Sequence, residues 1–124
     1  MKNSNLQTRK DHVFARGMGN VYPIFVEKAR NAEIWDAEGR RYIDFASGIA
    51  VCNTGHSHPK VVAAVKDQMD KFSHTCLMIN PYEVAIELAE KLIAIAPGQS
   101  EKKAIFLNSG AEAVENCIKI ARAY

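Results

Sequence analysis

Alternating apolar and polar residues predict a β-hairpin in the first half of the chain. Two alternating runs, residues 33–36 and 40–45, lie on either side of a turn that ends in glycine. Such a pair of runs is typical of antiparallel strands joined by a tight turn. The pairing would place Ile34 opposite Tyr42 or Ile43.

The segments around this hairpin carry weaker patterns. Residues 1–22 are mostly polar and predict an irregular leader, and residues 23–27 form a short extended stretch. Residues 46–55 are small and apolar and contain two glycines, a composition that favours neither a helix nor a long strand. We therefore expect residues 46–55 to form a buried connecting loop.

Apolar residues recur at helical spacing in the second half. Pro59 fits the first position of a helix that we expect to end near Lys71. A second helix is predicted from an N-cap at Asn80 to a stop at Pro97. A last helix is predicted to begin near Gly110.

Residues 104–107 form an uninterrupted apolar run, which is typical of a strand buried on both faces of a parallel sheet. One such strand followed by one helix cannot close an α/β sheet. The last helix also reaches Tyr124 without a glycine cap or a proline stop. The pattern therefore predicts an α/β protein whose parallel-sheet domain continues beyond Tyr124.

Composition and charge narrow the classes of partner. The chain of 124 residues is 48% hydrophobic and 24% charged, as in globular proteins, and its net charge is only +2. The charges are interspersed, which disfavours nucleic acid as the main partner. No apolar run approaches the roughly 20 residues that span a membrane. The polar N-terminus lacks the apolar core of a secretory signal, so we expect a cytoplasmic protein.

The cysteines and histidines offer little support for a redox or metal site. Cys52, Cys76 and Cys117 are far apart among apolar neighbours and are expected to be reduced, buried thiols. His56 and His58, with His74 farther along, form a weak metal-binding pattern because no Asp or Cys pair lies near them. We expect these histidines to form structural hydrogen bonds and predict no metal site.

The junction between residues 104–107 and the last helix is a candidate anion site. The first N–H groups of a helix have no acceptors within it, and this end of the helix dipole is positive. Gly110 and Ala111 would let an anion approach the main chain, and the Ser109 hydroxyl adds a donor. Glu112 and Glu115 should point away from such an anion. On spacing alone, an ordinary turn with Ser109 as the N-cap is the favoured interpretation.

Three separated stretches resemble one enzyme family, in its order and spacing. They are Asn108 to Asn116, Trp35 to Phe45, and Ser47 to Val51 followed by Asn53 to Pro59. They are similar to segments of the class III, fold type I, pyridoxal-phosphate-dependent aminotransferases, and most of all to the 4-aminobutyrate aminotransferases. The resemblance implies that residues 1–46 are an N-terminal hairpin segment of the small domain. Residues 47–124 would then begin the large cofactor-binding domain.

The resemblance also implies roles for individual residues. Ser109, Gly110 and Ala111 would hold the phosphate of pyridoxal 5'-phosphate, chiefly through the N–H groups of Gly110 and Ala111. Some 4-aminobutyrate enzymes have serine where this chain has Ala111, so a side-chain contact would be missing. Ile49 would line the substrate pocket, with plain core packing as the alternative.

No catalytic residue is expected within the chain. The family's Schiff-base lysine, its aspartate at the pyridine nitrogen, the aromatic residue stacked on the ring and the substrate-binding arginine would all lie beyond Tyr124. We therefore expect an inactive N-terminal fragment that exposes apolar faces and is poorly soluble alone.

The complete protein would transfer the amino group of an ω-amino acid such as 4-aminobutyrate to 2-oxoglutarate, as a homodimer. Two alternatives remain open at this point. The first is another activity of the class III family, on ornithine or acetylornithine. The second is an anion-binding module without catalysis.

Overall fold

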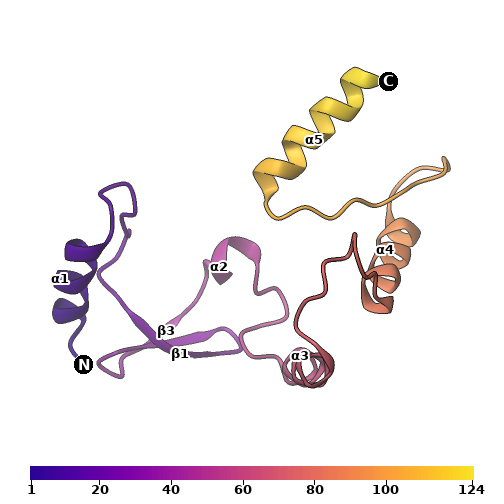
Figure 1. The fold of residues 1–124 in the computed structure, drawn as a ribbon. Helices are drawn as coiled ribbons and strands as arrows, with labels where there is room; N and C mark the ends of the chain where they lie inside the picture. Colours follow the sequence, from indigo (N-terminus) through magenta and orange to yellow (C-terminus); the bar gives the residue numbers. More distant parts are fainter. The chain divides into compact units, whose positions relative to one another are not determined.

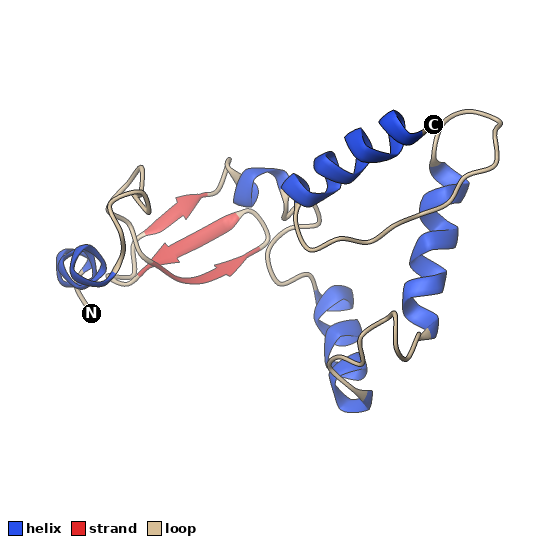
Figure 2. Cartoon of the chain, turned by 45° about the horizontal axis from the view of Figure 1, so that its top comes forward, coloured by secondary structure: helices blue, strands red, loops and turns tan.

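The computed structural model describes residues 1–124, which form two compact units. The first unit is Met1–Ser73 and the second is His74–Tyr124 (Figure 1). Strands occur only in the first unit, whereas the second consists of helices joined by irregular chain (Figure 2). Each unit is described by itself below.

The first unit contains the predicted hairpin, extended by one more strand. The strands β1 (Val26–Arg30), β2 (Glu33–Asp36) and β3 (Arg41–Ile43) form an antiparallel sheet in the order β1-β2-β3. Ile34 lies opposite Tyr42, which confirms one of the two predicted pairings.

The N-terminal segment is a helix, so the prediction of an irregular leader was wrong there. Helix α1 (Asn3–Val13) is mostly polar and has almost no amphipathic character, which explains why apolar periodicity missed it. Its first residue, Asn3, is buried and hydrogen-bonded to the hairpin. A polar contact at its start therefore holds this helix in place instead of an apolar stripe.

The segment between the sheet and the next helix is a loop, as predicted, but it is not buried. It contains a single turn, α2 (Ser47–Ala50), with positive φ angles. Ile49 and Val51 in this segment are 92% and 77% exposed. The expectation of burial failed because no layer of the unit covers this face.

Two of the three predicted helices have the expected starts. Helix α3 (Pro59–Lys71) has the predicted bounds, and α5 (Gly110–Ala123) begins at Gly110. Helix α4 (Glu83–Ile95) begins after the predicted cap at Asn80: the residue at its N-cap is Tyr82, and no side chain caps it.

Residues 104–107 do not form a strand, and the prediction of a buried strand was wrong for this chain. Ile105 is 64% exposed and Phe106 is 40% exposed. A strand needs a hydrogen-bonding neighbour, and the only sheet of the structure is the three-stranded one of the first unit. The apolar run therefore stays unpaired.

No apolar side chain of the structure is buried, and the two buried residues, Asn3 and Asp36, are polar. The three cysteines are free thiols, but none is buried, and Cys117 is exposed, so that part of the prediction was wrong. None of the helices combines the length and the apolar character needed to cross a membrane.

Candidate functional site

The start of α5 has the features expected of an anion-binding turn. Ser109 is the N-cap in extended conformation, and its Oγ accepts a hydrogen bond from the N–H of Glu112 at 3.2 Å. Its carbonyl oxygen accepts from the N–H of Ala113 at 3.0 Å. The N–H groups of Gly110 and Ala111 come first in the helix and have no acceptor within it. These two donors and the Ser109 hydroxyl proton are available to an anion.

The two glutamates near this turn differ in direction. Glu115 forms an ion pair with Lys119 at 2.6 Å along the helix, away from its start, as expected. Glu112 instead turns back, and its Oε2 accepts a hydrogen bond from the N–H of Asn108 at 2.9 Å. Ser109 Oγ caps the N–H of Glu112, while the Glu112 carboxylate accepts from Asn108, one residue before the N-cap, so the reciprocal bond of a capping box is not made. The expectation that Glu112 points away from the helix start was wrong, and its carboxylate is favoured at the positive end of the helix dipole.

Ile49 lies in a left-handed turn. The φ angles of Ser47, Gly48, Ile49 and Ala50 lie between 48° and 64°, a region that residues with a side chain rarely adopt. The side chain of Ile49 is 92% exposed. Core packing, the alternative role for Ile49, is therefore not seen within this unit.

A carboxylate holds the start of this turn. Asp44 Oδ1 accepts hydrogen bonds from the N–H groups of Ala46 at 3.1 Å and Ser47 at 2.9 Å. Its Oδ2 lies 2.6 Å from Nε2 of His56. The contact with His56 and then the N–H of Ser47 lower the pKa of Asp44 below its ordinary value of 3.8. Asp44 is thus held as a carboxylate at the junction of sheet and loop.

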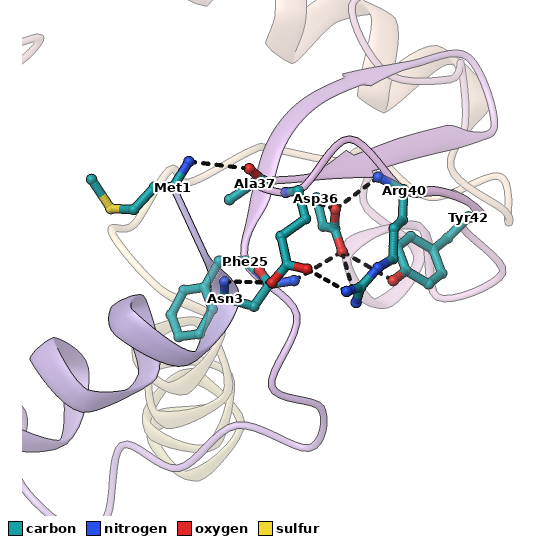
Figure 3. Close-up of polar contacts among 8 residues, drawn as sticks. Met1, Asn3, Phe25, Asp36, Ala37, Arg40 and Tyr42 are labelled. Atoms are coloured by element: carbon teal, nitrogen blue, oxygen red, sulfur yellow. Dashed lines mark hydrogen bonds and ion pairs between the residues drawn. The ribbon is translucent and has the colours of Figure 1, made fainter.

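A second carboxylate, Asp36, is fully buried at the hairpin turn (Figure 3). Its Oδ1 accepts from the N–H groups of Glu38 at 2.9 Å and Arg40 at 2.8 Å. Its Oδ2 accepts from the amide of Asn3 at 2.9 Å and the hydroxyl of Tyr42 at 3.0 Å. Burial raises the pKa of Asp36, but the hydrogen bonds from Arg40, Asn3, Glu38 and Tyr42 together lower it below 3.8.

The same cluster attaches α1 to the sheet. The N–H of Asn3 donates to Glu38 Oε1 at 2.9 Å, and Oδ1 of Asn3 accepts from the N–H of Phe25 at 3.0 Å. Glu38 also pairs with Arg40. Both carboxylate oxygens of Asp36 have partners within this cluster, so we assign Asp36 a structural role.

The histidines follow the expectation of structural hydrogen bonding in part. His56 pairs with Asp44, whereas Nδ1 of His58 is buried without a partner. No group of three or more His, Cys, Asp or Glu side chains is placed to hold a metal ion.

Sequence reasoning placed Ser109 to Ala111 at a helix start and Ile49 in a loop, and the structure agrees on both placements. The two candidates belong to different units. Sequence reasoning missed the two anchoring carboxylates. For Asp36 a signal was present, because an aspartate that opens a four-residue turn ending in glycine is a known turn former.

Known proteins resemble almost the whole chain. The family model for class-III aminotransferases matches residues 13–124. A 5-aminovalerate aminotransferase of Pseudomonas aeruginosa is 53% identical and a 4-aminobutyrate aminotransferase of Escherichia coli is 51% identical, each over 98% of this chain. The chain spans 28% of the length of each.

Solved structures of aminotransferases are also similar to this chain. An acetylornithine aminotransferase from Elizabethkingia anophelis matches with a TM-score of 0.85 at 30% identity, over 98% of this chain and 30% of its own. A taurine:2-oxoglutarate aminotransferase from Bifidobacterium kashiwanohense, solved with pyridoxal phosphate and glutamate, matches with a TM-score of 0.83 at 28% identity. That match covers 99% of this chain and 28% of the other.

Proposed function

Because the chain belongs to the class-III aminotransferases, we propose that the complete protein transfers the amino group of an ω-amino acid to a 2-oxo acid. The relatives that are about half identical carry the names of enzymes for 4-aminobutyrate and 5-aminovalerate, which differ by one methylene group. The name of the taurine enzyme supports 2-oxoglutarate as the acceptor. We further propose that the complete protein is a cytoplasmic homodimer.

We propose that the start of α5 binds the phosphate of pyridoxal 5'-phosphate. The residues present fit this group, because the N–H groups of Gly110 and Ala111 have no acceptor in the helix and the helix dipole favours an anion there. The Ser109 hydroxyl accepts from Glu112 and keeps its own proton to donate. Ala111 contributes only its main chain. When bound, the cofactor supplies an electron sink for amino-group transfer.

Ile49 is proposed to contact the substrate. Its exposed apolar side chain suits the methylene chain of an ω-amino acid, which gains free energy by leaving water. No residue of this chain is assigned to the chemical step. The 124 residues alone are therefore expected to be inactive.

The phosphate site is tested by removing one main-chain donor while keeping the helix. Gly110→Pro deletes the first N–H of α5, and proline is favoured at that position. Ser109 already has the extended conformation that a following proline requires, with φ −151° and ψ 161°. Gly110→Ala is the control, because an added Cβ meets nothing within 4 Å and the N–H stays.

The measurement is the dissociation constant of pyridoxal 5'-phosphate for the complete protein, followed by absorbance. We expect Gly110→Pro to weaken binding by about tenfold to a hundredfold, as for loss of a hydrogen bond to a charged group. Gly110→Ala should leave the affinity nearly unchanged. Equal affinities for the two variants would refute the role of this N–H group.

The substrate is tested with 2-oxoglutarate as acceptor and four amino donors: 4-aminobutyrate, 5-aminovalerate, ornithine and acetylornithine. We expect the two ω-amino acids to have the highest kcat/KM. A preference for ornithine or acetylornithine would replace the proposed donor. Binding of inorganic phosphate without transfer from any donor would favour the non-catalytic module.

A further inference from the structure

The turn that carries Ile49 is strained. Each residue with a side chain costs about 1–2 kcal/mol in left-handed helical conformation, and only glycine adopts it freely. Of the four residues in α2, only Gly48 is a glycine. Ile49, with φ 59° and ψ 61°, is branched at Cβ, which makes this conformation an outlier for it. A strained segment persists only where its surroundings impose it.

The carbonyl oxygen of Ala46 accepts from the N–H groups of Ile49 and Ala50 within the turn, at 2.8 and 3.2 Å. The side-chain contacts at the two ends of the loop converge on Asp44. One carboxylate oxygen binds the N–H groups of Ala46 and Ser47, the residues that lead into the left-handed segment. The other binds Nε2 of His56, which follows the segment. Asp44 thus connects both ends of the loop that presents Ile49.

His56 is itself fixed to the sheet. Its N–H donates to the carbonyl oxygen of Asn31 at 2.8 Å, and its carbonyl oxygen accepts from the N–H of Asn31 at 2.9 Å. The preceding Gly55 has φ +84°, and an added Cβ would lie 3.0 Å from Cα of Asn31. The main chain around His56 is therefore packed against the connection between β1 and β2, which gives Asp44 a rigid partner.

We propose that Asp44 and His56 are positioning residues that hold the left-handed turn Ser47–Ala50 and thereby set the place of Ile49 against the substrate. The proposal rests on the proposed function of Ile49. A cavity of about 270 Å³, lined by Asp44 and His56 among others, lies beside these groups. It gives the turn room to relax when the carboxylate is removed.

The position of an apolar contact decides how well substrates of different length fit. Small displacements of a contacting group reduce the efficiency of an enzyme strongly. A contact made equally in the ground state and the transition state changes KM and leaves kcat unchanged. Loss of the turn should therefore raise KM for the amino donor and weaken the discrimination between 4-aminobutyrate and 5-aminovalerate.

The experiment uses the complete protein loaded with pyridoxal 5'-phosphate. Asp44→Ala removes both acceptors, and His56→Leu removes the donor. His56→Gln is the conservative variant, because its amide nitrogen can reach the position of the imidazole Nε2. Asp67→Asn is the control for loss of a carboxylate, because Asp67 is exposed and paired only with Lys71 on its own helix.

We expect Asp44→Ala and His56→Leu to raise KM for the amino donor by about tenfold with a much smaller change in kcat. His56→Gln should restore most of the lost affinity, and Asp67→Asn should resemble the wild type. If kcat and kcat/KM instead fall by the same factor and His56→Gln restores neither, the proposal is overturned, because such losses indicate general damage to the protein.

A structural measurement separates this proposal from the proposed function. The crystal structure of Asp44→Ala is expected to show Ile49 with a negative φ angle. A positive φ retained in Asp44→Ala would overturn the positioning role, whatever the activity. The contact of Ile49 with the substrate is tested separately: if Ile49→Ala changes neither KM nor the discrimination between donors, that contact is refuted. The crystal structure of Asp44→Ala still decides whether Asp44 holds the turn.

Discussion

The hairpin region and the helical unit His74–Tyr124 are stabilised in different ways. In the hairpin, a fully buried carboxylate, Asp36, accepts four hydrogen bonds from side chains and main chain around it. In the helical unit, apolar side chains such as Leu88 and Ile118 are 48% and 55% exposed. Three of the four donors belong to the hairpin itself and the fourth, Asn3, comes from α1, whereas the helices present apolar faces that need partners outside the unit.

The difference follows from where each element takes its stability. A tight turn with an aspartate and the strands beside it are satisfied by hydrogen bonds between residues close in sequence. An amphipathic helix of 13 or 14 residues is marginal in water and depends on packing its apolar face. Separation from the other parts of a fold should therefore cost the helices more than the hairpin.

The largest effect is expected in hydrogen exchange of the 124-residue chain. Amides of α4 and α5 should be protected by less than about tenfold, because helices without tertiary packing open readily. The N–H groups of Asp36 and Asp44, which bond to carbonyl oxygens at 3.0 and 2.8 Å, should exchange more slowly. Equal protection of both units would show that they unfold together as one cooperative unit, and would refute the difference in stability between hairpin and helices.

The next effect concerns the buried carboxylate. Asp36→Ala leaves four donors without their acceptor, among them the amides of Glu38 and Arg40. We expect the protection of the Arg40 amide to fall by about tenfold to a hundredfold, as for an unsatisfied polar group. Asp11→Ala is the control, because Asp11 is exposed on α1. Unchanged protection in Asp36→Ala would mean that strand pairing alone holds the hairpin.

Acid should weaken the same region by a smaller amount. Asp36 and Asp44 both have a folded-state pKa below the ordinary value of 3.8. A lowered pKa stabilises the folded state above the ordinary value, and the stabilisation is lost as the pH falls through the lowered value. Fluorescence of Trp35, followed from pH 6 to pH 2, should report this loss. The change in fluorescence with acid should be smaller in Asp36→Ala. A change of full amplitude in this variant would show that protonation of Asp36 does not cause the acid transition.

The sequence predicted most of the hairpin and the helix starts because those signals are local. The pairing of Ile34 with Tyr42 follows from alternation around a turn, and the starts of α3 and α5 follow from Pro59 and Ser109. Each of these signals lies within a few residues of the structure that it specifies.

The features that the sequence did not predict depend on distant partners. Helix α1 is fixed by Asn3, whose partner Asp36 lies 33 residues away, and no periodicity reports such a contact. Residues 104–107 have the composition of a buried strand but no strand beside them. The left-handed conformation of Ile49 runs against its own preference, and the contacts proposed to hold it include the one between Asp44 and His56, which are 12 residues apart.

Two glycine-to-alanine substitutions, at Gly55 and Gly39, test how closely the main chain packs at the edge of the hairpin. Gly55→Ala combines a positive φ with a Cβ placed 3.0 Å from the main chain of Asn31. Gly39→Ala also has a positive φ, +80°, but its Cβ meets nothing within 4 Å. We expect the free energy of unfolding of the complete protein to fall by about 1–3 kcal/mol for Gly55→Ala. Urea denaturation should show a smaller loss for Gly39→Ala, and equal losses would refute the close approach.

The smallest effect is expected at the start of α5, the helical unit's counterpart of the Asp36 turn. Ser109→Ala removes one exposed cap, the bond from the Glu112 N–H at 3.2 Å, and should cost about 1 kcal/mol of helix stability. Circular dichroism of the chain, with Ser100→Ala as the control, measures this loss. The cap is a single hydrogen bond open to water, whereas Asp36 accepts four in a buried position, so the two substitutions should differ clearly. If Ser109→Ala disrupts α5 as strongly as Asp36→Ala disrupts the hairpin, then local polar contacts dominate both regions, and the contrast between them is wrong.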